Sequence, residues 1–311
     1  MTSQIIKKPL PYLALFLVYL IWGANFVVAK ITLQEFPPMS LAFLRFSLAS
    51  LFLAPFFLAQ TKKVKIKKED LPKLIATGVL IVTLNIAFFF EGIKRTTAID
   101  ASILTMIIPL LSVLLGWWFL KEKIYLINLS GVGLALLGAL IVLGLPQIFT
   151  GSVSTQILLG NILIILASIS WVVGAIISKQ LLTKYSSLVV TAIAFMVGTL
   201  TFLIPAASEY LQNPGWPSQI TILGILGLTY MTLLSSISAY FLFEWGLSKT
   251  SVSIADLFQY IEPFVATFLA VTILGERISQ SFLIGGGLIA VGAYLGTLAK
   301  EIHHRHKAHR I

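Results

Sequence analysis

The chain alternates long apolar runs with short polar connections. The runs have roughly 18 to 25 residues, which is enough for a helix to cross the hydrocarbon core of a bilayer. Helices are predicted for ten runs, at residues 10–29, 38–59, 71–93, 98–119, 126–144, 157–178, 187–206, 220–247, 252–273 and 280–299. The pattern therefore predicts an all-α membrane protein with ten transmembrane helices.

The second half of the chain repeats the first. A segment with Pro109, Glu122 and three glycines recurs 154 residues later, with Pro263 and Glu276 at the matching places. Such self-similarity indicates two related structural units. Five spans per half is an odd number, so the second half is expected to lie upside down relative to the first. The predicted organisation is an N-terminal segment, a first five-helix repeat, a linker, an inverted second repeat and a basic tail, at residues 1–9, 10–144, 145–156, 157–299 and 300–311.

The distribution of positive charge predicts an orientation. If the amino terminus is cytoplasmic, 17 Lys and Arg residues fall on the inner side, four on the outer side and Arg45 within a span, out of 22. Cytoplasmic connections of membrane proteins carry this excess of Lys and Arg. The net charge of +10 is therefore interpreted as the positive cytoplasmic side of a membrane protein with both termini in the cytoplasm, and not as a sign of nucleic-acid binding. The expected location is the plasma membrane, the inner membrane of a bacterium.

Composition excludes several kinds of chemistry. Only 11% of the residues are charged, against about a quarter in soluble domains, and there is no cysteine. All four histidines lie within residues 303–310, and the phosphate-binding pattern GxxxxGK[ST] does not occur. We therefore expect no enzyme activity, no catalytic residue, no metal site and no cofactor. The expected partners are a small-molecule substrate and the lipid bilayer, with the chain a monomer or a homodimer.

Glu262 is the most unusual residue of the apolar runs. It lies near the middle of the run at 252–273, directly before Pro263. A charged group at the bilayer centre costs about 2.5–3.5 kcal/mol on insertion scales, so such residues are functional candidates. Glu262 is interpreted as a site for a cation, an ammonium group or a coupling proton. The alternative is a neutral, hydrogen-bonded acid that fixes helix packing. Pro263 and its repeat mate Pro109 are predicted helix hinges.

A polar stripe runs along the span at 220–247, where polar residues recur every fourth position and so share one helical face. Its members are Thr232, Ser236, Tyr240 and Glu244, and Asp256 and Gln259 begin a comparable stripe in the next span. Such a stripe is expected to face protein or a water-filled cavity rather than lipid. It is interpreted as cavity lining, with hydrogen bonding between helices as the alternative.

Two charged hairpins lie at inverted positions and are candidate gates. Glu91 and Asp100 flank the predicted outer one, and Glu244 and Asp256 flank the inner one. The alternatives are ordinary solvated helix ends and an interfacial salt bridge around Lys249.

Four further residues complete the candidate cavity. Asn25 and Asn85 lie within apolar runs, and Trp22 is interpreted either as a surface for the substrate or as packing. Arg45 is deep enough to need a counter-charge, and it either holds a substrate carboxylate or anchors the helix by extending toward the outer interface. The candidate substrate-binding residues are Trp22, Asn25, Arg45, Asn85, Ser236, Tyr240, Gln259 and Glu262.

These segments also resemble a known family. The stretches WGANFVVAK at 22–30 and PPMSLAFLRF at 37–46, with the duplicated Pro–Glu–Gly unit, are similar to the drug/metabolite transporter superfamily and its EamA family. The resemblance spans roughly residues 12–143 and 157–298. It implies a ten-helix transporter, commonly an exporter of amino acids or derivatives, whose first four helices in each half line a central cavity. The alternatives are a drug exporter or lipid-carrier flippase on the same fold, or a non-transporting receptor or structural subunit.

The inverted repeats also indicate a transporter, independently of the resemblance. They are typical of secondary transporters, which bind their substrates near the membrane midplane between the repeats. The sequence therefore predicts an alternating-access transporter of a small polar metabolite, with Glu262 as the candidate for proton coupling.

Overall fold

The computed structural model describes residues 9–62, 65–120, 126–144, 154–250 and 252–308, and these residues form helices and no strand. The helices of the first half are α1 Pro9–Thr32, α2 Pro38–Thr61, η1 Lys68–Asp70, α3 Leu71–Gly78, η2 Val79–Leu84, α4 Asn85–Arg95, α5 Ala98–Thr105, α6 Ile108–Leu120 and α7 Leu126–Val142. Those of the second half are α9 Thr155–Leu181, α10 Ser187–Gln212, η3 Trp216–Gln219, α11 Ile222–Tyr230, η4 Met231–Ser238, α12 Ala239–Lys249, α13 Val252–Leu257, η5 Phe258–Tyr260, α14 Ile261–Leu269, η6 Ala270–Leu274 and α15 Gln280–Ala308.

Seven helical stretches in the described part of the chain are long and apolar enough to cross a membrane, judged by length and composition. They are Pro9–Thr32, Pro38–Thr61, Lys68–Arg95, Ala98–Leu115, Thr155–Leu181, Ser187–Gln212 and Ile222–Lys249. Shorter apolar helices cover Leu129–Val142, Phe258–Leu274 and Gln280–Leu295. The predicted apolar runs thus coincide with helices, to within a few residues at most ends.

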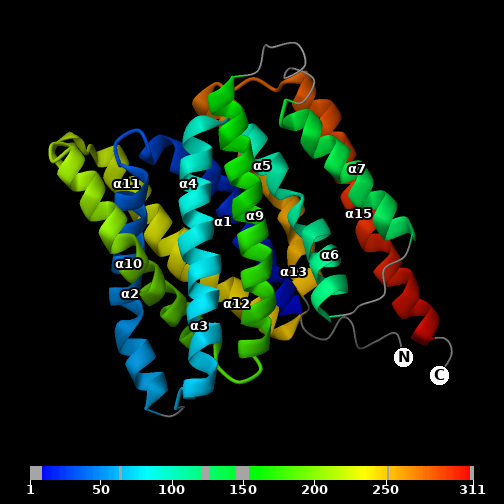
Figure 1. The fold of residues 1–311 in the computed structure, drawn as a ribbon, viewed down its shortest axis with the longest axis horizontal. Helices are drawn as coiled ribbons and strands as arrows, with labels where there is room; N and C mark the ends of the chain where they lie inside the picture. Colours follow the sequence, from blue (N-terminus) through cyan, green and yellow to red (C-terminus); the bar gives the residue numbers. More distant parts are fainter. Residues whose placement is uncertain (1–8, 63–64, 121–125, 145–153, 251, 309–311) are drawn as a thin grey trace.

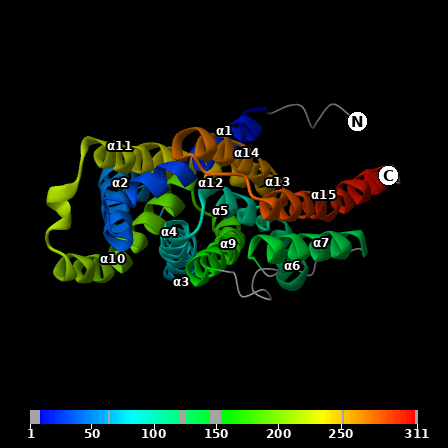
Figure 2. The ribbon, with the colours of Figure 1, turned by 90° about the horizontal axis from the view of Figure 1, so that it is seen from above.

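The helices form two layers. Seen from above, α11, α1 and α14 lie along one side of the molecule, and α10, α4 and α9 lie along the other (Figure 2). Helices α2 and α10 pack together at one end, and α7 and α15 pack together at the other (Figure 1). A Cβ atom at Gly285 of α15 would lie 2.6 Å from the Gly138 carbonyl oxygen of α7. Glycine is therefore needed where these two backbones meet, since small residues allow membrane helices to approach closely.

Two of the long helices contain a π-helical segment at matching positions of the halves. The segments η2 and η4 overlap when the chain is shifted by 154 residues. A π turn widens the helix and leaves carbonyl groups available to other donors, and such segments are frequent at functional sites. Here Ser170 donates to the Leu80 carbonyl at 2.7 Å, and the Trp22 indole donates to the Ser235 carbonyl at 3.0 Å. The π segments therefore supply acceptors that hold the neighbouring helices α9 and α1.

Helices cover the run predicted over 98–119, with a short break inside it. Helix α5 ends at Thr105 and α6 begins at Ile108, because Pro109 has no N–H and is tolerated in the first turn of a helix. Pro263 occupies a similar place near the start of α14, after the 3-10 turn η5. Both prolines thus lie beside a helix break, and whether these breaks move as hinges stays a prediction.

Candidate functional site

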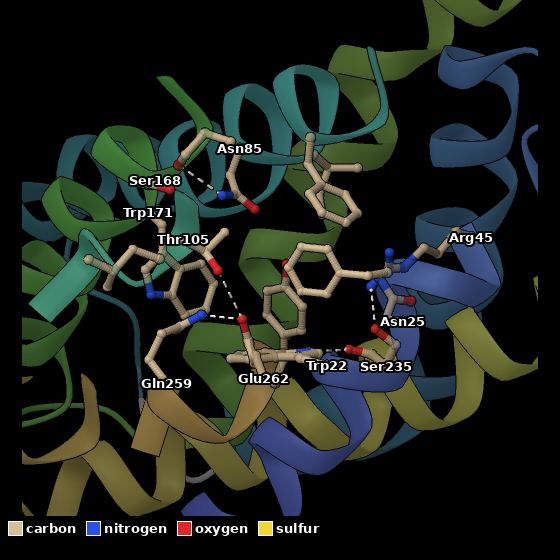
Figure 3. A pocket seen from close by; sticks show the side chains of 16 residues that line it. Trp22, Asn25, Arg45, Asn85, Thr105, Ser168, Trp171, Ser235, Gln259 and Glu262 are labelled. Carbon is tan, nitrogen blue, oxygen red and sulfur yellow. Dashed lines mark hydrogen bonds between the residues drawn. The ribbon is translucent and has the colours of Figure 1, made fainter. Parts of the chain in front are cut away.

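A cavity lies between the two layers, near the breaks at Pro109 and Pro263. It contains about 570 Å³ of space between atoms, a volume that includes open solvent at its mouth. Its lining residues come from seven of the ten predicted apolar runs, in both halves. They are Trp22, Asn25, Phe26, Arg45, Asn85, Ile86, Phe89, Thr105, Ile108, Ala167, Ser168, Trp171, Ser235, Tyr240, Gln259 and Glu262. The structure thus brings together seven of the eight predicted substrate-binding residues (Figure 3).

One helix departs from what the family resemblance implies. The described residues of α10 do not line the cavity, because α10 packs against α2. Helices α7 and α15 also lie away from the cavity and pack against each other, as the resemblance implies.

Glu262 forms an acidic pole of the cavity. Its side chain is buried, and its Oε2 atom accepts hydrogen bonds from Gln259 Nε2 and, at 3.4 Å, from the Thr105 hydroxyl. The same hydroxyl donates to the Ser102 carbonyl at 2.7 Å, so its one hydrogen serves two acceptors. A Cβ atom at Gly23 would lie 3.1 Å from the Glu262 carbonyl oxygen, so α1 approaches the backbone of Glu262 closely.

Arg45 forms a basic pole on another side of the cavity, next to Asn25 (Figure 3). The expectation that Arg45 extends toward the outer interface is wrong, because only 1% of the residue is exposed. Its Nε atom donates to the Ser236 hydroxyl at 2.6 Å, and its Nη2 atom donates to the Ser235 hydroxyl at 3.2 Å. Hydroxyl groups of η4 therefore hold the guanidinium inside the protein.

An aromatic wall separates the two poles. The ring centroids of Trp22 and Trp171 lie 5.0 Å apart, and that of Tyr240 lies 5.4 Å from Trp22 and 5.9 Å from Trp171. All three pairs have edge-to-face geometry, which aromatic rings favour. The rings thus pack on one another and also line the cavity, so the two interpretations of Trp22 describe the same arrangement.

The remaining candidate, Asn85 of α4, is hydrogen-bonded to the neighbouring helix α9. Its Nδ2 atom donates to the Ala167 carbonyl of α9 at 2.9 Å. Ser236 does not line the cavity itself but holds Arg45, whereas its neighbour Ser235 lines it. The stripe with a four-residue period fails here because the π turn shifts the register of the helix.

Two lysines close matching corners of the halves, and we call them the lysine clamps. In the first clamp, Lys30 donates to the carbonyls of Ile93, at 3.4 Å, and Thr96, and lies 3.8 Å from Glu276. Glu276 also accepts hydrogen bonds from the first amides of α5, those of Ala98 and Ile99, at 2.9 and 3.1 Å.

In the second clamp, Lys179 donates to the carbonyls of Leu247 and Thr250, each at 2.5 Å. Shifts of 149 and 154 residues relate the two lysines and their carbonyl partners, so the clamps are repeat mates. Glu122, the repeat mate of Glu276, lies outside the described residues.

Two of the predicted gate residues lie close to these clamps, because Asp100 interacts electrostatically with Lys30 and Glu276, and Glu244 interacts with Lys179. Glu91 pairs with Arg95 one turn away on the same helix, and the amide of Asp100 bonds to its N-cap Thr97. Glu244 is buried and accepts a hydrogen bond from the Ser178 hydroxyl at 2.7 Å. Asp256 lies in α13, and its side chain is outside the described part of the structure.

Sequence reasoning missed several polar residues of this region. Thr105, Ser168 and Ser235 line the cavity, and Lys30, Glu276 and Lys179 form the clamps. A signal existed for Thr105, since it is the repeat mate of Gln259. The hydroxyls of single serines and threonines in apolar runs give no such signal, because they commonly bond to their own helix. Among the described residues, no cluster of three His, Cys, Asp or Glu side chains is placed to hold a metal ion.

Known proteins resemble this chain over nearly its whole length. A protein of Archaeoglobus fulgidus, named an uncharacterized transporter, is 31% identical over 93% of this chain and 98% of its own length. A protein of Salmonella typhimurium, named a probable amino-acid metabolite efflux pump, is 29% identical over 94% of this chain and 95% of its own length. One solved crystal structure has the same fold, with a TM-score of 0.64 and 19% identity over 93% of this chain and 97% of that chain.

The sequence pattern of the EamA-like transporter family matches residues 9–144 and 158–298, which cover both halves. The chain therefore belongs to the EamA-like transporter family, and it is a multi-pass integral membrane protein.

Proposed function

We propose that the protein exports a small polar metabolite, an amino acid or a derivative, by alternating access across the bacterial inner membrane. The observation that carries this proposal is the cavity lined by both halves, in which an acid, a guanidinium and an aromatic wall converge. Small-molecule sites combine apolar walls with a few placed polar groups in this way. The name of the Salmonella relative supports an amino-acid metabolite as the cargo.

The proposed architecture is ten membrane spans in two inverted repeats, at residues 10–144 and 157–299, with both termini in the cytoplasm. The matching positions of η2 and η4, of Thr105 and Gln259, and of the lysine clamps support it. Because an inverted repeat places matching corners at opposite faces, the Lys30 clamp lies at the outer face and the Lys179 clamp at the inner face. We assign the clamps as the two gates, since each ties the end of a hairpin to a neighbouring helix.

Glu262 is the proposed proton carrier. Removal from water favours the neutral form of a carboxyl group. A protonated Glu262 donates to Thr105 Oγ1 when the Thr105 hydrogen serves the Ser102 carbonyl, so the site accommodates both forms. Release of this proton on one side of the membrane would couple export to the proton gradient.

A counterflow assay with the purified protein in proteoliposomes tests the proposed function. Vesicles loaded with one unlabelled amino acid should accumulate the same labelled amino acid transiently, and protein-free vesicles should not. A panel of the twenty amino acids identifies the cargo. The absence of counterflow for every member, from a folded protein, would contradict amino-acid transport.

A further inference from the structure

Arg45 is a buried cation that no carboxylate of the described protein neutralises. Two of its nitrogens donate to the neutral hydroxyls of Ser235 and Ser236. Its third nitrogen, Nη1, has no hydrogen-bond partner among the described residues, although it is fully buried. The ion pairs found in the described part of the chain involve other residues.

This arrangement is costly unless a ligand completes it. A guanidinium keeps its proton in proteins, so burial cannot neutralise it as it can a carboxyl group or a lysine. A buried charge without a partner costs several kcal/mol. Arg45 lines the cavity, and Glu262 lies on another side of the same cavity, not paired with Arg45 (Figure 3). A negative group that enters the cavity would therefore satisfy Arg45.

A second polar atom lies unsatisfied beside it. Asn25 Oδ1 is buried without a partner among the described residues, and Asn25 is next to Arg45 (Figure 3). The wall therefore presents a free donor and a free acceptor side by side. An α-amino acid carries the complementary pair on adjacent atoms, with a carboxylate that accepts and an ammonium group that donates.

We propose that Arg45 and Asn25 bind the head group of the cargo, a carboxylate on Arg45 Nη1 and an ammonium group on Asn25 Oδ1. The inference rests on the proposed function and specifies its recognition site. A phosphate dianion fits less well, because Arg45 is the one cationic residue in the described lining and Glu262 is an acid. The aromatic wall of Trp22, Trp171 and Tyr240 takes the cargo's side chain. Glu262 then stays free to carry a proton.

Binding to the full-length protein in detergent tests this site. The probes are the twenty amino acids, their amides, which lack the carboxylate charge, and the matching acids without the amino group. Affinity is measured from the ligand dependence of thermal unfolding. For the best amino acid, the amide should bind roughly 30-fold or more weakly, as expected for loss of one partner of a buried charged pair.

Three variants separate recognition from folding. Arg45→Gln should weaken the binding of the best amino acid but not the binding of its amide, so the ratio of the two affinities should fall to about one. Arg45→Lys keeps the charge and should retain part of the ratio, which protects the test if Arg45→Gln does not fold. Asn25→Leu should weaken the binding of amino acids more than the binding of the matching acids without an amino group. A purely structural role of Arg45 would lower stability and leave the ratio unchanged.

The outcomes distinguish this site from the proposed function. A wild-type acid-to-amide ratio near one, or an unchanged ratio in Arg45→Gln, would overturn the inference even if amino acids show counterflow. Binding of acids without an amino group, dependent on Arg45, with no binding of amino acids would overturn amino-acid export and keep the carboxylate site.

Discussion

Breaking one lysine clamp should open one side of the transporter, and breaking its repeat mate should open the other. The Lys30→Met variant loses the hydrogen bonds to the carbonyls of Ile93 and Thr96 and the ion pair with Glu276. The Lys179→Met variant loses the hydrogen bonds to the carbonyls of Leu247 and Thr250. Methionine keeps much of the length and apolar character of the lysine stem, so the change is mainly one of charge and hydrogen bonding.

The size of the expected shift between the closed and the open state follows from the solvent exposure of the first clamp. A hydrogen bond to a charged group is worth about 1.5–3 kcal/mol. The Lys30 side chain is 26% exposed and that of Glu276 is 10% exposed, so solvent screening weakens the clamp, and we use about 2 kcal/mol for the whole of it. If the clamp forms only in the state that is closed on its side, its loss shifts the equilibrium toward the open state by up to about 30-fold.

The chain has no native cysteine, so a single introduced cysteine reports accessibility without background. Ser168→Cys places it in the cavity wall. A membrane-impermeant thiol reagent is added outside intact cells or inside inverted vesicles, and the rate of modification is measured. Lys30→Met should raise the rate from outside and lower it from inside, whereas Lys179→Met should do the reverse.

Exposed lysines provide matched controls for the charge change. Lys94→Met lies near the first clamp in sequence and Lys249→Met near the second, and both lysines are exposed. Neither control should change the rate more than about 2-fold. If both clamp variants shift accessibility in the same direction, or if neither differs from its control, the lysine clamps are not the gates.

Three further predictions follow from the same geometry. Glu262→Gln should abolish transport driven by a pH gradient, with normal abundance in the membrane and counterflow retained if Glu262 carries only the proton; wild-type gradient-driven transport would remove it from the mechanism. Gly285→Ala, whose Cβ would meet the Gly138 carbonyl, should cost about 1–3 kcal/mol and lower the thermal midpoint, whereas Gly287→Ala, with open space around it, should not; equal midpoints would contradict the close α7–α15 contact. A cysteine at Ser218 should react with an impermeant reagent outside intact cells and one at Thr61 should not; the opposite pattern would reverse the proposed orientation.

The sequence determined the helices, the duplication and most of the polar residues of the cavity. Apolar runs of bilayer length have to form helices, because a backbone in lipid must satisfy its own hydrogen bonds. For the same reason, polar groups such as Asn25, Tyr240 and Glu262 have to face inward, so their chemistry alone indicated that they belong to a protein-lined space. The interval of 154 residues indicated which parts of the halves correspond, and it would also have paired Thr105 with Gln259.

Only the tertiary structure decided which side chains meet. The sequence indicated Glu91 and Asp100 as candidate gate residues, whereas the contact between Lys30 of α1 and Glu276 of the segment before α15 is visible only in the structure. The π turn of η4 brought Ser235 to the cavity and turned Ser236 toward Arg45. These partners depend on how each helix is rotated and how far it extends against its neighbours. That rotation is set by packing between the layers and by glycine contacts such as Gly23 with the backbone of Glu262. Local spacing fixes the face of a helix but not the helix that this face will meet.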